Sequence, residues 1–247
     1  MKVFVSESYE TMSKQAAGEI IRLTQLHKNP VVCTASGDTP TGVYKKIINI
    51  INKEHLNISD WIFIGLDEWI GMNGNDEGSC RYYLDQQLFQ PLQVVDEKIC
   101  FFDGRAKNLE AECERVENFI SQHGGIDIAI LGLGMNGHIG MNEPGTSKYA
   151  RSHVSELDVT TQQVGQKYFK NQQTLSRGIT LGTASLLEAR HIILLVSGNH
   201  KAGIVQQIIE GEISEQLPAS LLRLHPELKI YLDMDAAANI MRPLNEP

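Results

Sequence analysis

The sequence predicts an α/β fold: a doubly wound, mostly parallel sheet with helices on both faces, in a single domain spanning residues 1–247. Three observations predict it. Short apolar runs alternate with segments of helical periodicity, which implies right-handed crossovers between parallel strands. Several runs are apolar throughout, which is typical of strands covered on both faces. The chain has 247 residues, 42% of them hydrophobic, enough for one large core.

Seven strands and four helices are expected. The strands are the apolar runs at residues 3–5, 31–35, 61–66, 126–134, 178–182, 191–198 and 228–234. The helices are indicated by apolar residues at three- and four-residue spacing, which share one face of a helix. These faces comprise Met12, Ala16, Ile20 and Leu23; Val43, Ile47, Ile50 and Ile51; Leu109, Cys113, Val116 and Ile120; and Ala202, Val205, Ile208 and Ile209. Glycines at 124, 125 and 211 terminate the last two.

Charge and hydropathy exclude several classes of partner. The net charge of −8 disfavours binding to nucleic acid or to an anionic membrane surface. The apolar runs are far shorter than the ~20 residues that a membrane-spanning helix needs. The first ten residues, MKVFVSESYE, do not form a signal peptide. We therefore expect a cytoplasmic protein with no nucleic-acid or membrane partner; an oligomer is possible.

The four cysteines give no sign of a metal site or a redox motif. Cys33, Cys80, Cys100 and Cys113 form no C-x-x-C pair, which argues against a zinc ribbon or a thioredoxin-type centre. We expect reduced, mostly buried thiols.

Ligands of open parallel sheets bind beyond the carboxyl ends of the strands, so the residues after each apolar run are the first candidates for a site. SGDTPTGVYKK follows the second run. Thr39 is expected to cap a helix, with Ser36 and Gly37 in the preceding turn, where free N–H groups could bind a phosphate. A plain strand-to-helix turn is the alternative. Neither a Walker loop nor G-x-G-x-x-G is present, so nucleotide binding is not indicated.

LDEWIGM follows the third run and places Asp67 and Glu68 side by side, flanked by two tryptophans. A carboxyl group shielded by apolar side chains has a raised pKa and can serve as a base near neutral pH. Asp67 comes first after the strand and is the one expected to point into the crevice. Two solvated acids in a surface turn are the alternative.

GLGMNGHIGMNEPG follows the fourth run. His138 can transfer protons near pH 7, and Glu143 and Asn136 could orient its ring or tune its pKa. The glycines allow the backbone to approach a ligand closely. A buried histidine without function is the alternative. A lone histidine at this position does not predict a metal site.

GNHKAGIVQQII follows the sixth run, with Asn199 as the expected helix cap and Lys201 in the first turn. A lysine in the first turn is repelled by the positive end of the helix dipole, unless an anion binds to both the lysine and the free N–H groups of the helix. An exposed lysine that bends away from the helix end is the alternative. Together the strand ends suit proton transfers on a small phosphorylated substrate. No G-x-S-x-G is present and no cysteine lies in a nucleophile context, so covalent acyl chemistry is disfavoured.

Three of these motifs resemble the glucosamine-6-phosphate deaminase/isomerase family: LDEWIGM, GLGMNGHIGMNEPG and the Ser197-Gly198…Lys201 context. The resemblance covers nearly the whole chain. It is closer to the galactosamine-6-phosphate branch in four stretches: GGIDIAILGLGMNGHIGMNEPG (124–145), HVSELDVTTQQ (153–163), SRGITLG (176–182) and PASLLRLHP (218–226).

The resemblance implies a Rossmann-like fold and conversion of an aminosugar 6-phosphate to tagatose or fructose 6-phosphate plus ammonia, in amino sugar catabolism. It implies that Asp67 moves a proton between C2 and C1 and that His138 opens the pyranose ring, supported by Glu143. The loop of Ser36, Gly37 and Thr39 would bind the phosphate together with Lys201. No metal or organic cofactor is implied.

The sequence departs from the family pattern at several places. Asn136 stands where some members have aspartate; because asparagine carries no charge, Glu143 should matter more. Asp38 stands in the phosphate loop where a small neutral residue is usual, and its side chain is expected to turn outward. The phosphate-binding arginine has no clean match, Lys167 and Arg177 being the nearest candidates. The longer tail of regulated members is absent, so no strong activation by an acetylated aminosugar phosphate is expected.

Two alternative functions are considered. A 6-phosphogluconolactonase uses a related fold, but lactone hydrolysis needs no base for a carbon-bound proton, so the match around Asp67 favours the isomerase. A non-catalytic sugar-phosphate sensor would need a DNA-binding segment, and no basic helix-turn-helix pattern is present.

Overall fold

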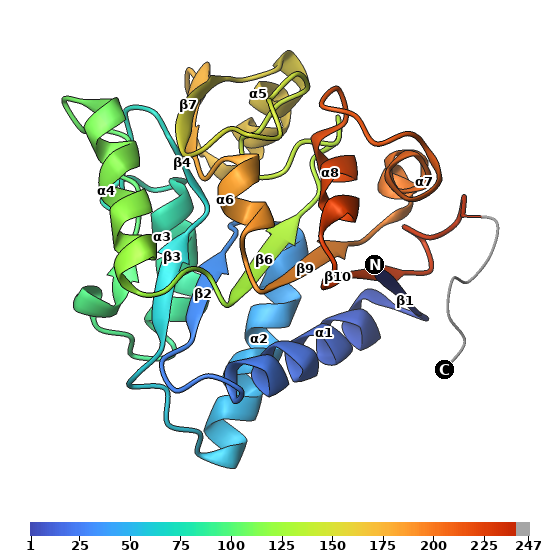
Figure 1. Cartoon of the computed structure of the whole chain (residues 1–247), viewed down its shortest axis with the longest axis horizontal. Coiled ribbons are helices and arrows are strands. Elements are labelled where there is room, and N and C mark those ends of the chain that lie inside the picture. Colours follow the sequence, from blue (N-terminus) through green and yellow to red (C-terminus); the bar gives the residue numbers. More distant parts are fainter. Residues whose placement is uncertain (241–247) are drawn as a thin grey trace.

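The computed structural model describes residues 1–240, and its centre is a seven-stranded sheet (Figure 1). The strand order is β1-β10-β9-β6-β2-β3-β5, and all neighbouring pairs are parallel. The bounds in that order are Lys2–Ser6, Leu228–Asp233, His191–Val196, Ile128–Gly132, Val31–Thr34, Ile62–Gly65 and Ile99–Cys100. The predicted doubly wound, mostly parallel sheet is confirmed.

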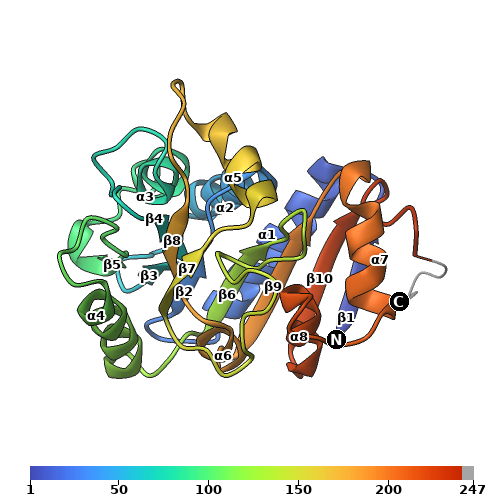
Figure 2. The same ribbon diagram turned by 90° about the horizontal axis from the view of Figure 1, so that it is seen from above.

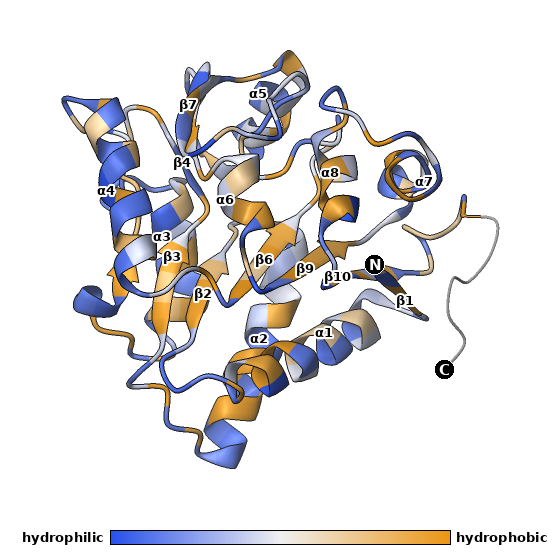
Figure 3. Ribbon diagram, in the orientation of Figure 1, coloured by the Kyte–Doolittle hydropathy of each residue, from blue (hydrophilic) through white to orange (hydrophobic). Residues whose placement is uncertain are grey.

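Helices cover both faces of this sheet (Figure 2). One face packs against α1 (Tyr9–Thr24) and α2 (Asp38–Glu54), and the other against α4 (Leu109–Gln122), α6 (Thr183–Leu187), α7 (Ala202–Glu210) and α8 (Pro218–Leu221). Successive residues of each strand face opposite layers, so the strands at the sheet centre are largely apolar on both faces, as Figure 3 shows. Polar residues such as Lys2, Lys229 and Asp233 lie on β1 and β10, towards one edge of the sheet. The four predicted helices are present, and their apolar faces are buried except for Ile50 and Leu109, which are half-buried.

A second, antiparallel sheet of three strands stands apart from the main sheet. It contains β4 (Asp67–Trp69), β8 (Arg177–Thr180) and β7 (His153–Glu156), in that order. The expectation that residues 178–182 belong to the parallel sheet is therefore wrong. Thr180 pairs with both Asp67 and His153 in antiparallel register. A short apolar run indicates that a strand is buried, but it does not indicate which strands it will pair with.

Several short elements were not predicted from periodicity, because each is too short to show one. Besides α6, α8, β4, β5 and β7, given above, they are α3 (Cys80–Leu84), a π-helical turn (Asp85–Phe89), α5 (Val159–Gly165) and the 3₁₀ turns Asp96–Lys98, Gln166–Tyr168, Asn199–Lys201 and Leu222–Leu224. No helix within residues 1–240 is long and apolar enough to cross a membrane. One domain over 1–247 stays a prediction, since residues 241–247 lie outside the described part.

Candidate active site

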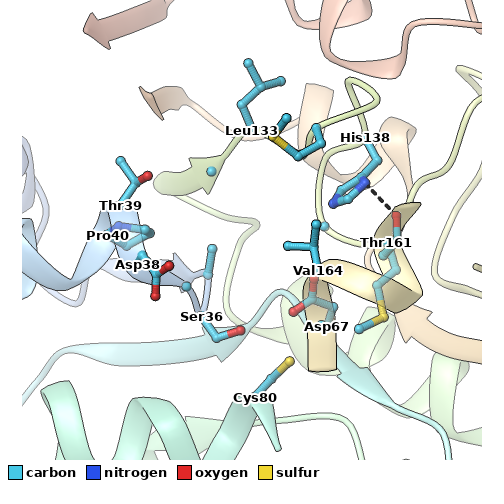
Figure 4. Close-up of a pocket in the computed structure, with 18 of the residues that line it drawn as sticks. Ser36, Asp38, Thr39, Pro40, Asp67, Cys80, Leu133, His138, Thr161 and Val164 are labelled. Carbon is cyan, nitrogen blue, oxygen red and sulfur yellow. Dashed lines mark hydrogen bonds between the residues drawn. The ribbon is translucent and has the colours of Figure 1, made fainter. Parts of the chain in front are cut away.

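One cavity lies at the carboxyl ends of β2, β3, β6 and β9, as expected for an open parallel sheet. Six of the eight predicted site residues line it: Ser36, Gly37, Thr39, Asp67, His138 and Lys201. The other two, Asn136 and Glu143, are hydrogen-bonded behind His138. Figure 4 shows Asp67 and His138 facing the same cavity, with Ser36, Asp38 and Thr39 along another side.

The loop after β2 ends at Gly37, which is the N-cap of α2. Its φ of 134° is a conformation that residues with a side chain rarely adopt. The predicted N-cap at Thr39 is wrong, since the helix begins at Asp38 and no side chain caps it. The helix N-terminus therefore offers uncapped N–H groups to the cavity, as a phosphate site requires. The Thr39 hydroxyl lies 3.2 Å from that of Ser197, which connects this loop to the end of β9.

Lys201 lies directly before α7, at its N-cap position. The predicted N-cap at Asn199 is wrong: a 3₁₀ turn, Asn199–Lys201, follows Gly198 and precedes the helix. The Lys201 ammonium donates a hydrogen bond to the carbonyl of Leu133 at 2.6 Å. Burial and the neighbouring charge of Lys167 lower the pKa of Lys201 to about 8. A bound anion would stabilise the protonated amine at this position.

A second lysine faces the phosphate loop. Lys167, in the 3₁₀ turn after α5, lines the cavity, and its ammonium lies 2.5 Å from the carboxylate of Asp38. Asp38 is 65% exposed and turns to Lys167 at the mouth of the cavity. Arg177, the other candidate for a phosphate-binding cation, lies exposed on β8 and does not line the cavity.

Asp67 is held at the start of β4, where it is only 8% exposed. The chain leaves the main sheet at Leu66, whose N–H donates to Thr34 and whose carbonyl accepts from Leu181. Burial raises the pKa of Asp67 from its ordinary value of 3.8 to about 7, although a hydrogen bond with the Cys80 thiol opposes the shift. The alternative of two solvated acids in a surface turn is thus wrong.

Glu68 points to the opposite side of β4 and is fully buried. Its carboxylate accepts hydrogen bonds from the backbone N–H groups of Trp69, Cys80 and Arg81. Burial raises the pKa of Glu68, and these three donors oppose that effect. Glu68 thereby fixes the start of α3 beside β4, which brings the Cys80 thiol to Asp67.

His138 is linked to Glu143 through Asn136. The imidazole Nδ1 lies 2.7 Å from the amide oxygen of Asn136, whose NH₂ donates to Glu143 at 2.7 Å. Because that amide oxygen can only accept, Nδ1 carries the proton and Nε2 is free to exchange one. Burial lowers the pKa of His138, and the Glu143 carboxylate, 3.7 Å from Nδ1, opposes this. The neutral imidazole is the form favoured at pH 7.

Two further features fix the position of the imidazole. Any Cβ at Gly134 would lie 2.3–2.4 Å from three atoms of the His138 ring, so only glycine allows the ring to lie there. From α5, the Thr161 hydroxyl lies 3.0 Å from Nδ1 (Figure 4). This segment therefore contacts the histidine through Thr161 and the phosphate loop through Lys167.

Sequence reasoning missed Cys80, Thr161, Tyr168 and Ser197 as cavity residues. Ser79, which caps α3 by accepting from Tyr82, was the available signal for a helix at Cys80. Thr161 and Tyr168 lie in short helical turns far from the catalytic motifs in sequence. Thr161 falls within residues 153–163, a stretch that carried the family resemblance, but no pattern in it indicated a role for that residue. Within residues 1–240, no cluster of three or more His, Cys, Asp or Glu side chains could hold a metal ion.

Comparison with known proteins gives a consistent result. Residues 6–230 match the family model described as glucosamine-6-phosphate isomerases/6-phosphogluconolactonase. The chain is 36% identical to a glucosamine-6-phosphate deaminase of Oceanobacillus iheyensis, over 97% of this chain and 96% of that protein. It is also 36% identical to glucosamine-6-phosphate deaminase 1 of Bacillus subtilis, over 98% of this chain and all of that protein.

Solved structures show the same relationship. A monomeric glucosamine-6-phosphate deaminase superposes with a TM-score of 0.93 at 36% identity, covering 96% of this chain and 99% of that one. A 6-phosphogluconolactonase from Trypanosoma brucei superposes with a TM-score of 0.73 at 19% identity, covering 97% and 98%. The second likeness shows a shared fold alone.

Proposed function

The chain belongs to the glucosamine-6-phosphate isomerase/6-phosphogluconolactonase family, and we propose that it is a deaminating aldose–ketose isomerase of aminosugar 6-phosphates. The reaction would convert the aminosugar to the ketose 6-phosphate and ammonia. One observation carries the proposal: a buried carboxyl group with a pKa near 7, a neutral histidine and an uncapped helix N-terminus with two lysines line one cavity.

The phosphate would bind at the start of α2. The N–H groups after Gly37 and the hydroxyls of Ser36 and Thr39 can donate to its oxygens, and Lys201 and Lys167 balance its charge. Lys201 donates to a carbonyl from the adjacent strand end, which holds its ammonium over the cavity. The sugar would extend from this point to Asp67 and His138.

His138 would open the pyranose ring. In its neutral form, Nε2 can accept the proton of the anomeric hydroxyl and return it to the ring oxygen as the bond from C1 to that oxygen breaks. Asn136 and Glu143 support the imidazolium that forms in between, because the carboxylate charge favours the protonated ring. The product of this step is the open-chain aldehyde.

Asp67 would then move a proton from C2 to C1. Its carboxylate takes the C2 proton while the substrate's own ammonium group gives a proton to O1, which forms an enolamine. The resulting carboxylic acid then protonates C1, which leaves an iminium at C2 and restores the carboxylate. Water hydrolyses that iminium to the ketone and ammonium. A pKa of about 7 suits both halves of this transfer, because the group must accept and donate a proton at neutral pH.

The 6-phosphogluconolactonase alternative is less well supported. Lactone hydrolysis needs no base for a carbon-bound proton, whereas Asp67 is buried beside the cavity with a raised pKa. The similar lactonase structures share below 25% identity with this chain, while relatives at 36% carry the deaminase name. A non-catalytic sensor is disfavoured because the matching relatives are enzymes by name over nearly their whole length.

Two epimeric substrates are candidates. The names of the relatives support glucosamine 6-phosphate, and the four stretches noted in the sequence favour galactosamine 6-phosphate. The two sugars differ at one hydroxyl, and both present the same phosphate, C1 and C2 to the residues described above.

The test is ammonia release from each epimer by the wild type, Asp67→Asn and His138→Gln. We expect turnover of at least one epimer, with kcat/KM for the two giving the preference directly. Asp67→Asn should abolish isomerisation while the substrate still binds. Hydrolysis of 6-phosphogluconolactone without ammonia release from either aminosugar would overturn the proposal.

A further inference from the structure

Asp38 is an anionic side chain inside a phosphate loop, where it carries a charge of the same sign as the ligand. It is the first residue of α2, and its carboxylate pairs with Lys167 at 2.5 Å. Both residues line the cavity, so the pair lies beside the wall that a phosphate would contact. We propose that Asp38 weakens phosphate binding by holding Lys167 in an ion pair that the phosphate must displace. This inference rests on the phosphate site of the proposed function.

The backbone at Asp38 is fixed independently of its carboxylate. The Tyr9 hydroxyl lies 3.0 Å from the carbonyl oxygens of both Asp38 and Thr39 and accepts from the N–H of Gly42 at 2.7 Å. A neutral residue at position 38 should therefore leave the loop in place, and its effect should be electrostatic.

Two lysines and one carboxylate determine the charge of this end of the cavity. Lys167 and Lys201 are close enough for the charge of one to lower the pKa of the other. A phosphate dianion would be balanced by both lysines if both were available. In the free protein Lys167 is already paired with Asp38. Phosphate binding therefore exchanges one ion pair of Lys167 for another, and the binding free energy is smaller than two unpaired lysines would give.

The expected gain in phosphate affinity can be estimated from how exposed the Asp38–Lys167 ion pair is to solvent. Asp38 is 65% exposed and Lys167 is 47% exposed, and pairs of this kind stabilise a structure only weakly. Releasing Lys167 should therefore tighten phosphate binding by about 1.5- to 5-fold. The gain should shrink as salt is added, because the charges are accessible to counter-ions.

The first experiment measures the Kd of inorganic phosphate by calorimetry for the wild type and Asp38→Asn at low and high ionic strength. Asp38→Glu keeps the charge and should bind phosphate as the wild type does. Asp60→Asn makes the same charge change at an exposed residue near the amino end of β3, away from the cavity, and gives the baseline. A gain for Asp38→Asn equal to that of Asp60→Asn would overturn the inference.

The second experiment separates ion pairing from simple repulsion. If the gain comes from releasing Lys167, Asp38→Asn should tighten binding much less in a Lys167→Gln background. If Asp38 only repels the phosphate, the gain should be retained or grow without Lys167, and this outcome would overturn the inference.

The inference and the proposed function fail in different ways. If the wild type releases ammonia but Asp38→Asn binds phosphate no more tightly, the inference about Asp38 is wrong and the proposed function stands. If Asp38→Asn binds phosphate more tightly in a way that depends on Lys167, but the protein releases no ammonia, the inference is supported and the proposed function is wrong. In an active enzyme, Asp38→Asn should lower KM by the same factor as Kd.

Discussion

Replacing Asp67 with asparagine should make the protein more stable and inactive. The change keeps the size of the side chain and removes its charge. Burial raises the pKa of Asp67 from 3.8 to about 7, so ionising this carboxyl group in the folded protein is costly. A pKa difference of this size means that the ionised Asp67 lowers the free energy of unfolding by about 4 kcal/mol.

The pH range of this effect follows from the two pKa values. Between pH 3.8 and 7 the unfolded chain has lost the proton and the folded chain retains it, so raising the pH favours unfolding. Above pH 7 both states are ionised, and the full destabilisation persists. Asparagine has no such dependence. The stability gain of Asp67→Asn over the wild type should therefore rise by about 3 kcal/mol between pH 5 and pH 8.

Urea unfolding of the two proteins at pH 5 and pH 8 measures this difference, since all other titrating groups contribute nearly equally to both. Ammonia release measured on the same samples should fall by at least about 10²-fold. A mutant that is less stable than the wild type at pH 8, or one that keeps normal turnover, would refute the reasoning about Asp67.

Three other predictions follow from the site. The kcat/KM for ammonia release should rise with pH up to about pH 7, because Asp67 must be ionised to take a proton, and should fall above about pH 8, where Lys201 loses its charge; a profile that is flat from pH 5 to 9 would contradict this. His138→Gln should slow turnover by about 10²–10⁴-fold, and Glu143→Gln should slow it less, because Asn136 still accepts from the imidazole. Lys201→Gln should raise KM by about 10- to 100-fold with little change in kcat, the value of a charged hydrogen bond; an equal fall in kcat would assign Lys201 to the chemical steps instead.

The layer architecture could be predicted from the sequence because burial leaves a local signature. Strands such as Ile128–Gly132 are apolar on both faces, and helices such as α1 repeat apolar residues at three- and four-residue spacing. The cavity could be located because parallel strands end at one edge, so residues after each run meet there. Asp67, His138 and Lys201 were all found in this way.

The remainder of the site depends on contacts between distant segments. Cys80 reaches Asp67 only because Glu68 binds the N-terminus of α3, and Thr161 reaches His138 from a helix of seven residues. No local pattern records such contacts. The two misplaced helix caps have one cause: Gly37 and Gly198 adopt positive φ, and the helical turn begins directly after each glycine without a side-chain cap.

The central claim is that one six-carbon phosphosugar spans the cavity, and a crystal structure with the reduced, open-chain aminosugar 6-phosphate tests it most directly. The account predicts the phosphate at the N-terminus of α2, within hydrogen-bond distance of Lys201, and C1 and C2 beside the Asp67 carboxylate. A ligand bound elsewhere, or one that touches the phosphate loop while C2 points away from Asp67, would contradict it.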